Sequence, residues 1–404
     1  MTDTKPPSPS AQFIRSIKGA IAYWRKRTQE MDDNTIRRLD AERQNIFQAV
    51  QFGLVPPQTW RDAAMVVLQT FDLIEQRGYW QEWIPVMEMA ITHCADDQLH
   101  LKVKLLNQLG QFYRFLWQLV PALAAHKEAE TIAQQLRDEQ MLAESHCSLS
   151  ELYLRQRQYD KAEQYGQSAL TQFTNVDVEE KWLAATLNTL GELARFRGDL
   201  LLAEKRLSQA AAHWRSLNKP VRIARTLNDL AVTFLAAGKF EQAHQCYIEV
   251  VTLLEPTTNE LDKVMVQINL GVLYFRQEKW IEAEAVFRKA DSACIQQSPN
   301  IYYQALIANN LGNVLLKQNR LEEAALYLHN AAAFWRQTGD NLELANTLGT
   351  LAETTIAQKR VLDAIPLYEE AIEILSDIPD DARAENLQKS FVAQQEAIQF
   401  TSKQ

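Results

Sequence analysis

Asparagine recurs along this chain at multiples of about forty residues, and its amide can both donate and accept hydrogen bonds. Asparagine is a poor helix former, so helix propensity does not explain why it returns at one position of a helical pattern. A row of such amides matches the backbone of an extended peptide, but it also suits bonds to neighbouring helices or to water. The amides in this row and beside it are Asn107, Asn188, Asn228, Asn269, Asn309, Asn310 and Asn313.

Basic residues recur on the same expected helix faces. Guanidinium groups bind carboxylates and phosphates through paired hydrogen bonds, so this row predicts a site for an acidic or phosphorylated segment. The balance is basic from Arg195 to Lys317, although the whole chain has a net charge of -9. The cations are Lys104, Arg114, Arg155, Arg195, Arg225, Arg276 and Lys317, and the acids expected opposite them are Glu144, Glu151, Glu192 and Glu353.

The sequence carries none of the common catalytic or cofactor motifs, such as G-x-S-x-G, H-E-x-x-H or a glycine-rich phosphate loop. We therefore expect no enzyme activity, no cofactor and no metal. Cys94, Cys147, Cys246 and Cys294 lack metal or redox spacing, which favours small buried residues in a reducing compartment. Other acids are expected on solvated helix faces.

Charge and hydropathy narrow the choice of partner and compartment. The acidic balance argues against nucleic acid as a partner. No run of 18 or more apolar residues occurs, which predicts no membrane partner and a cytoplasmic location.

The elements that would position these side chains repeat in steps of 40 or 41 residues. In each step a leucine and a small residue mark a first helix, and an alanine marks a second helix. A period of this size predicts an array of helical hairpins, and the small residues predict close approach of the paired helices. Gly198 and Gly238 lie in the expected turns. The leucines are Leu109, Leu149, Leu190, Leu230, Leu270, Leu311 and Leu351, and the alanines are Ala122, Ala162, Ala203, Ala243, Ala283, Ala324 and Ala364.

The residue pattern of the two helices resembles the tetratricopeptide repeat (TPR). It is Leu, Gly or Ala, Tyr in the first helix and Ala, Phe or Tyr, Ala in the second. The units are longer than the basic repeat of about 34 residues. They are similar to those of kinesin light chains and bacterial signalling proteins, as in Asn309-Asn310-Leu311-Gly312. The resemblance covers roughly residues 60–375. It implies an all-α, right-handed TPR superhelix (α-solenoid) of about eight helical hairpins, whose first helices line a concave groove.

The segment Leu39–Ile46 and the helix pair after it resemble a junction in bacterial signalling NTPases of the NB-ARC (STAND) type. There the ATPase core meets a C-terminal TPR sensor region. This chain has no phosphate loop, so the resemblance implies the sensor half alone. The expected segments are a disordered N-terminus (1–10), N-terminal helices (11–56), a degenerate first TPR (57–95), seven TPR units (96–376) and a C-terminal capping helix (377–404).

These observations predict a non-enzymatic scaffold or signalling module that binds an extended acidic segment of a protein or peptide in its concave groove. The alternative is a ligand- or peptide-responsive regulator, the sensor half of a STAND-type or peptide-pheromone-type system. A third interpretation, an aspartyl-phosphate phosphatase of the same architecture, finds only Gln44 and Gln48 without a motif. The sequence leaves open a homodimer through the terminal helices.

Overall fold

The computed structural model describes residues 10–29, 31, 33–175, 180–297, 300–378 and 381–401. Throughout these ranges the chain is built from α-helices and two short 3-10 helices, with no strand. The all-α prediction is confirmed. The segment expected to be disordered lies outside the described residues except for Ser10, whose hydroxyl accepts a hydrogen bond from the Phe13 amide and begins the first helix.

The chain forms two compact units, Met1–Thr226 with Pro256–Asn259, and Leu227–Glu255 with Glu260–Gln404. The boundary falls inside α13 (Pro220–Ala236). The first unit contains α1 (Ala11–Arg27), α2 (Asp33–Ala41), α3 (Arg43–Gly53), α4 (Pro57–Gln69), α5 (Phe71–Arg77), α6 (Trp80–Thr92), the 3-10 helix η1 (Asp96–Gln98), α7 (Leu99–Phe115), α8 (Leu119–Leu136), α9 (Glu139–Arg155), α10 (Tyr159–Asn175), α11 (Glu180–Phe196) and α12 (Leu200–Ser216). The second contains α14 (Phe240–Leu254), α15 (Glu260–Arg276), α16 (Trp280–Gln297), α17 (Ile301–Lys317), α18 (Leu321–Thr338), α19 (Asn341–Ala357), the 3-10 helix η2 (Val361–Ala364), α20 (Ile365–Ser376) and α21 (Ala382–Thr401).

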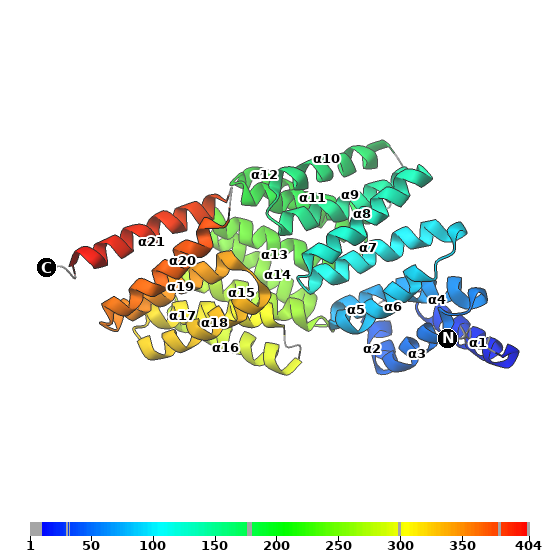
Figure 1. Cartoon of the computed structure of the whole chain (residues 1–404), viewed down its shortest axis with the longest axis horizontal. Helices are drawn as coiled ribbons and strands as arrows, with labels where there is room; N and C mark the ends of the chain where they lie inside the picture. The colour runs from blue at the N-terminus through cyan, green and yellow to red at the C-terminus, as the bar shows by residue number, and fades with distance from the viewer. Residues whose placement is uncertain are drawn as a thin grey trace, which may run out of the picture. The chain divides into compact units, whose positions relative to one another are not determined.

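Helices α7 to α20 pair into hairpins at the predicted period, with η2 and α20 together forming the last second helix. Figure 1 shows α7 to α12 as successive pairs in the first unit, and α15 to α18 likewise in the second. All seven predicted alanines of the second helices are 0% exposed. With α4, α5 and α6 as a degenerate hairpin, the prediction of about eight hairpins is confirmed.

Small residues in the first helices allow this close packing. A β-carbon built at Gly271 would lie 2.5 Å from the ring of Phe287, and one at Gly312 would lie 2.5 Å from Leu328. Both partners come from the second helix of the same hairpin. A larger residue would push the helices apart, because protein interiors leave no room for it.

The seven turns share one backbone geometry. Gly198 and Gly238 have φ of 82° and 71° as their residue type allows, and five other residues adopt the same left-handed conformation, with φ between 59° and 63°. That conformation costs a non-glycine residue roughly 1–2 kcal/mol. The packing of the paired helices therefore imposes the turn, whichever residue stands there. The five residues are Trp117, Arg157, Glu278, Asn319 and Lys359.

Two helical stretches are interrupted. Within the predicted N-terminal helices (11–56), the chain after Thr35 forms two helices, α2 and α3, because the Glu42 amide donates to the Leu39 carbonyl three residues back and tightens the turn. The first helix of the degenerate hairpin breaks at Thr70. Its hydroxyl donates hydrogen bonds to the carbonyls of Val66 and Val67, at 3.0 and 2.9 Å. Such side-chain bonds compete with the helical ladder.

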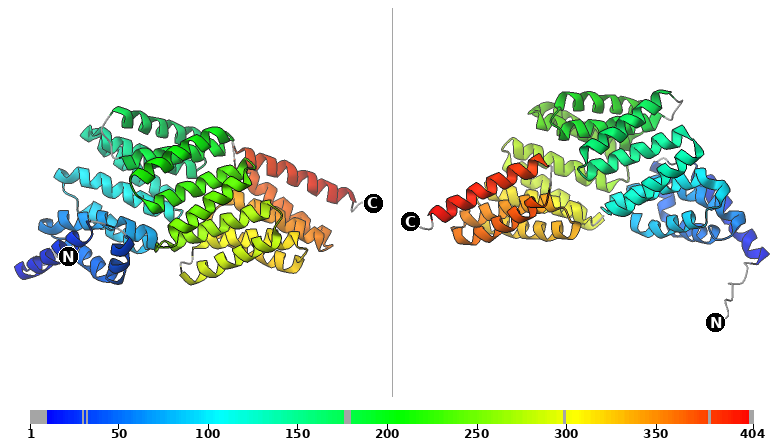
Figure 2. Two further views of the ribbon diagram at one scale, coloured as in Figure 1. Left: turned by 180° about the vertical axis from the view of Figure 1, so that it is seen from behind. Right: turned by 45° about the horizontal axis from the view of Figure 1, so that its top comes forward.

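The C-terminal helix α21 lies along α20 and covers the end of the second unit (Figure 2). Its Phe391 ring occupies the space above Gly349, where an added β-carbon would lie 2.2 Å away, and meets Tyr368 with ring centroids 5.6 Å apart. Ala384, Phe391 and Ile398 are buried, while the other described side chains of the helix are half-buried or exposed. The predicted capping helix, with its single apolar stripe, is confirmed.

Replacing Ala243 with leucine is expected to lower the free energy of unfolding by about 1–3 kcal/mol, because the completely buried site in α14 has no space for three more carbons. Glu241→Ala, two residues earlier on the exposed side, should change it by less than about 0.5 kcal/mol. Urea unfolding followed by circular dichroism measures both. Equal losses would show that the helix faces are assigned wrongly.

Candidate functional site

The side chains predicted to bind a partner lie on the first helices of the hairpins, which we call the first-helix wall: α7, α9, α11 and α13 up to Thr226 in the first unit, and the rest of α13 with α15, α17 and α19 in the second. Three of the predicted amides bond from one first helix to the next. Asn107 is 4% exposed and donates to the Ser145 hydroxyl at 3.2 Å. Asn228 accepts from Asn269 at 2.8 Å, and Asn309 accepts from the Thr347 hydroxyl at 2.9 Å.

The other amides bond within their own helices. Asn188 donates to Glu192 at 3.3 Å, one turn further along α11. Asn310 and Asn313 donate to the carbonyls of Leu306 and Asn309, both at 2.9 Å. Within the described chain, therefore, this row of amides links helices of the wall or lies along them.

The predicted cations form an ion-pair ladder on the same wall. Arg114 of α7 pairs with Glu151 of α9 at 3.2 Å. Arg155 of α9 pairs with Glu192 of α11 through two bonds of 3.0 Å. Each rung joins a cation near the end of one first helix to a glutamate two residues after the repeat leucine of the next.

The ladder stops at Arg195. In the next repeat the position two residues after Leu230 is Val232, which has no charge. Among the described residues no carboxylate pairs with Arg195, and its buried Nε has no hydrogen-bond partner. Its guanidinium lies 4.4 Å from the Phe196 ring centroid. This cation–π contact does not prevent the guanidinium from binding an anion. In the second unit, Arg276 and Lys317 are exposed, and no ion pair is found for them in the described ranges.

Arg225 has a partner that the sequence did not reveal. It donates to Glu75 of α5 at 2.7 Å, and Arg222, one turn earlier in α13, donates to the other oxygen of the same carboxylate at 2.8 Å. Burial alone would raise the pKa of Glu75, but the charges of Arg222 and Arg225 outweigh it and hold the pKa below its usual value. No local pattern could have found Glu75, because 147 and 150 residues separate it from its partners.

The expectation that the other acids occupy solvated faces is wrong for Glu75 and Glu130, which are 4% and 9% exposed. Glu144 and Glu192, which were expected on the wall, are buried as well. Their side chains have partners, such as Lys127 at 2.9 Å and His146 at 3.3 Å from Glu130. Burial of a charge is tolerated where such partners replace water.

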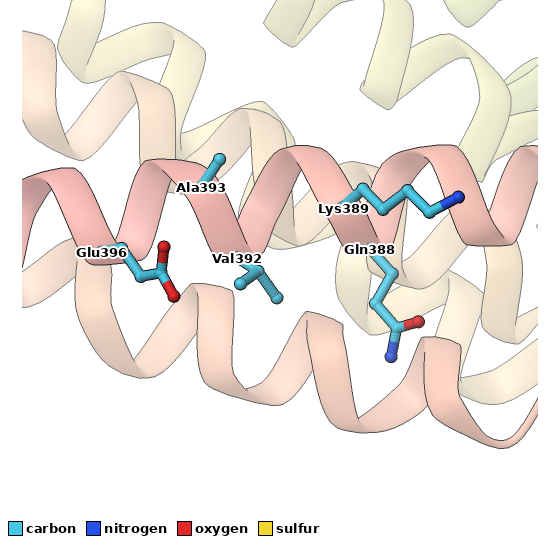
Figure 3. Close-up of a pocket in the computed structure, with 5 residues that line it drawn as sticks. All are labelled: Gln388, Lys389, Val392, Ala393 and Glu396. Atoms are coloured by element: carbon cyan, nitrogen blue, oxygen red, sulfur yellow. The ribbon is translucent and has the colours of Figure 1, made fainter.

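Other features of the described chain offer no site for chemistry. A hollow of about 360 Å³ is lined by five residues of α21 alone, and in Figure 3 their side chains leave one helix in different directions. No group of three or more His, Cys, Asp or Glu side chains within the described ranges could hold a metal ion, and none of the four cysteines is in a disulfide bond there. None of the helices described is long and apolar enough to cross a membrane. Gln44 and Gln48 are exposed, and Gln44 donates to Glu82 at 3.0 Å.

Successive helical hairpins whose first helices present a charged wall define a helical-repeat protein. One family model of the tetratricopeptide repeat matches residues 182–255 and 303–377, and a second model of the same repeat matches residues 228–299. The chain is a tetratricopeptide repeat protein. None of the curated proteins matches this sequence.

Solved structures of low sequence identity share the fold. Aspartyl phosphate phosphatase F from Bacillus subtilis is 14% identical with a TM-score of 0.56, and the match covers 93% of this chain and 97% of that one. NprR in complex with its cognate peptide NprX is 12% identical with a TM-score of 0.52, covering 71% and 82%. A Signal Transduction ATPase with Numerous Domains (STAND) protein with a TPR sensor, from Pyrococcus horikoshii, is 14% identical with a TM-score of 0.54, covering 87% of this chain and 55% of that one.

The stability of the wall is expected to depend on pH through His126, which packs on Gly110 and contacts the Asn107 amide oxygen at 3.2 Å. Burial, helped by the charge of Arg114, lowers the pKa of His126 to about 4 from 6.5. Between those values the unfolded chain binds a proton that the folded chain does not. The free energy of unfolding should therefore fall as the pH falls from 6.5 to 4, by about 1.4 kcal/mol per pH unit from this residue.

Urea unfolding at several pH values tests this expectation. His126→Gln should flatten the fall, whereas His329→Gln, on an exposed face of α18, should leave it unchanged. If the free energy of unfolding of His126→Gln falls with pH as steeply as that of the unmodified protein, His126 is not the group responsible.

Proposed function

We propose that this chain is a non-catalytic binding module that holds an extended acidic segment of a protein or peptide along the first-helix wall of its first unit. The observation that carries the proposal is the end of the ion-pair ladder at Arg195. Arg114 and Arg155 have glutamate partners in the next repeat, whereas Arg195 has none among the described residues.

An incoming carboxylate would complete the ladder. Arginine forms paired, charge-assisted hydrogen bonds with carboxylates, and such bonds are stronger where the surroundings are partly desolvated. Arg195 is half-buried and its Nε is already out of water. A bound acidic side chain would therefore supply the partner that Val232 does not.

The remaining predicted residues have different parts in this proposal. Arg276 and Lys317 belong to the second unit, where we propose them as anion-binding residues of that unit by itself. Arg155 and Arg225 are already paired, and Asn107, Asn228 and Asn309 hold first helices together. Asn188, Asn310 and Asn313 are only half-buried and can contact the segment's backbone.

Two of the structural neighbours point to different activities: NprR is solved in complex with its cognate peptide, and another neighbour is an aspartyl phosphate phosphatase. At 12% and 14% identity both are evidence for the fold alone, so the proposal rests on Arg195. Cysteines without disulfide bonds suit a reducing compartment, and we propose a cytoplasmic location, with neither nucleic acid nor membrane as a partner.

A labelled glutamate-rich peptide is the probe for this proposal, and its glutamine counterpart is the control. Fluorescence anisotropy should show binding of the glutamate peptide, and Arg195→Glu should weaken it about tenfold or more, because an attraction becomes a repulsion. Arg215→Glu makes the same charge change on the exposed side of α12 and should have little effect. Equal binding of the two peptides, or equal effects of the two variants, would rule out Arg195 as the anchor.

A further inference from the structure

An ion pair joins α5 to the far end of the first-helix wall in the first unit. Glu75 lies near the end of α5, in the first helix of the degenerate hairpin, and its partners Arg222 and Arg225 lie near the start of α13, four hairpins later. Only 4% of Glu75 is exposed. The row α5, α7, α9, α11 and α13 must therefore curve until its two ends meet.

Further contacts hold the same closure. Arg77 of α5 donates to the Thr258 carbonyl at 3.4 Å, and Arg37 of α2 donates to the Pro256 carbonyl. The loop Pro256–Asn259 belongs to the first unit, and its residues Thr257, Thr258 and Asn259 are buried. Arg77 is itself held by Asp40, whose other oxygen accepts from the Tyr79 hydroxyl at 2.8 Å. The N-terminal helices thus bind chain that lies about 180 residues or more further on.

The contact between Glu75 and the two arginines is of the same chemical kind as the contact proposed for the ligand. One carboxylate is held by two guanidinium groups on the wall. We propose that Glu75 is an internal pseudo-ligand: it occupies a carboxylate site formed by Arg222 and Arg225, and an acidic residue of the bound segment displaces it and releases α5 from α13. This inference rests on the proposed function and assigns it a regulated site.

The exchange has a built-in selectivity. Opening without a ligand would break both ion pairs of Glu75 and leave two partly buried guanidinium groups unpaired, which is unfavourable. Exchange for another carboxylate keeps both arginines paired and lets Glu75 return to water. A neutral segment offers no such compensation, so only an acidic one opens the closure.

Glu75→Gln tests the proposal because it keeps the size of the side chain and removes the competing charge. In this variant the glutamate-rich peptide should bind about tenfold tighter, because a larger fraction of the protein has the arginine pair available. Hydrogen exchange of the α5 amides should rise in the variant without peptide, and in the unmodified protein when peptide is added. Glu75→Asp, whose shorter side chain cannot reach both arginines, should shift both measurements in the same direction.

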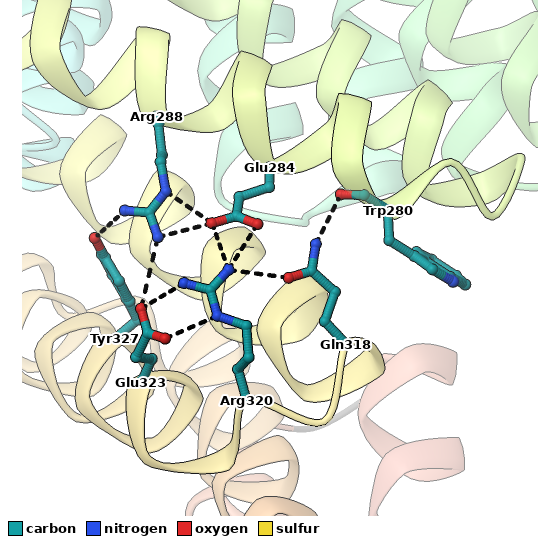
Figure 4. Close-up of polar contacts among 7 residues, drawn as sticks. All are labelled: Trp280, Glu284, Arg288, Gln318, Arg320, Glu323 and Tyr327. Atoms are coloured by element: carbon teal, nitrogen blue, oxygen red, sulfur yellow. Dashed lines mark hydrogen bonds and ion pairs between the residues drawn. The ribbon is translucent and has the colours of Figure 1, made fainter.

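Glu284→Gln is the matched control. Glu284 of α16 also accepts from two arginines, Arg288 and Arg320, each at 2.8 Å, and joins two neighbouring hairpins of the second unit (Figure 4). Its loss should change neither peptide affinity nor exchange of α5.

The outcomes separate the two proposals. If Glu75→Gln leaves peptide affinity unchanged and the α5 amides stay protected from hydrogen exchange, the pseudo-ligand inference is overturned. The proposed function would still stand. If the glutamate-rich peptide binds neither the unmodified protein nor Glu75→Gln, both proposals are wrong. If Glu284→Gln binds the peptide as much more tightly as Glu75→Gln does, the gain comes from the change in net charge. That result would also overturn the inference.

Discussion

The close approach of the two helices in each hairpin is the constraint on which the rest of this structure depends. Seven alanines at one repeat position are completely buried, and glycines such as Gly271 and Gly312 receive the side chains of the opposite helix. This short separation determines how the chain must turn. Five non-glycine residues accept the left-handed conformation, because interhelical packing outweighs the local strain.

Regular packing also decides which polar groups meet. Once consecutive first helices lie side by side, the side chains that face the next repeat are about forty positions apart in sequence. Asn107 with Ser145 and Arg155 with Glu192 are such pairs. Many polar groups of the wall are therefore paired with one another, whereas Arg195 has no carboxylate partner among the described residues.

Charge pairing on the wall connects shape with function. The carboxylate of Glu75 neutralises two arginines and at the same time joins the two ends of a curved row of helices. The binding module proposed above would not need a separate switch, because the groups that would recognise an acidic segment also hold the unbound form together. Affinity and conformation would then be coupled through the same ion pairs.

The sequence by itself determined the helical hairpins, their number, the buried alanines and the capping helix. Interhelical packing requires small residues at the same position of every repeat, so it is visible as a period in the sequence. It also placed a row of amides and cations on the first helices. It could not assign their partners, because the same amide can bond a peptide or the next helix, and only the distance between helices decides. The breaks at Glu42 and Thr70 depended on single side-chain bonds that periodicity does not report. The pairing of Glu75 with Arg222 and Arg225 was decided by tertiary structure alone, because the curvature that joins them accumulates over four hairpins and no local stretch encodes it.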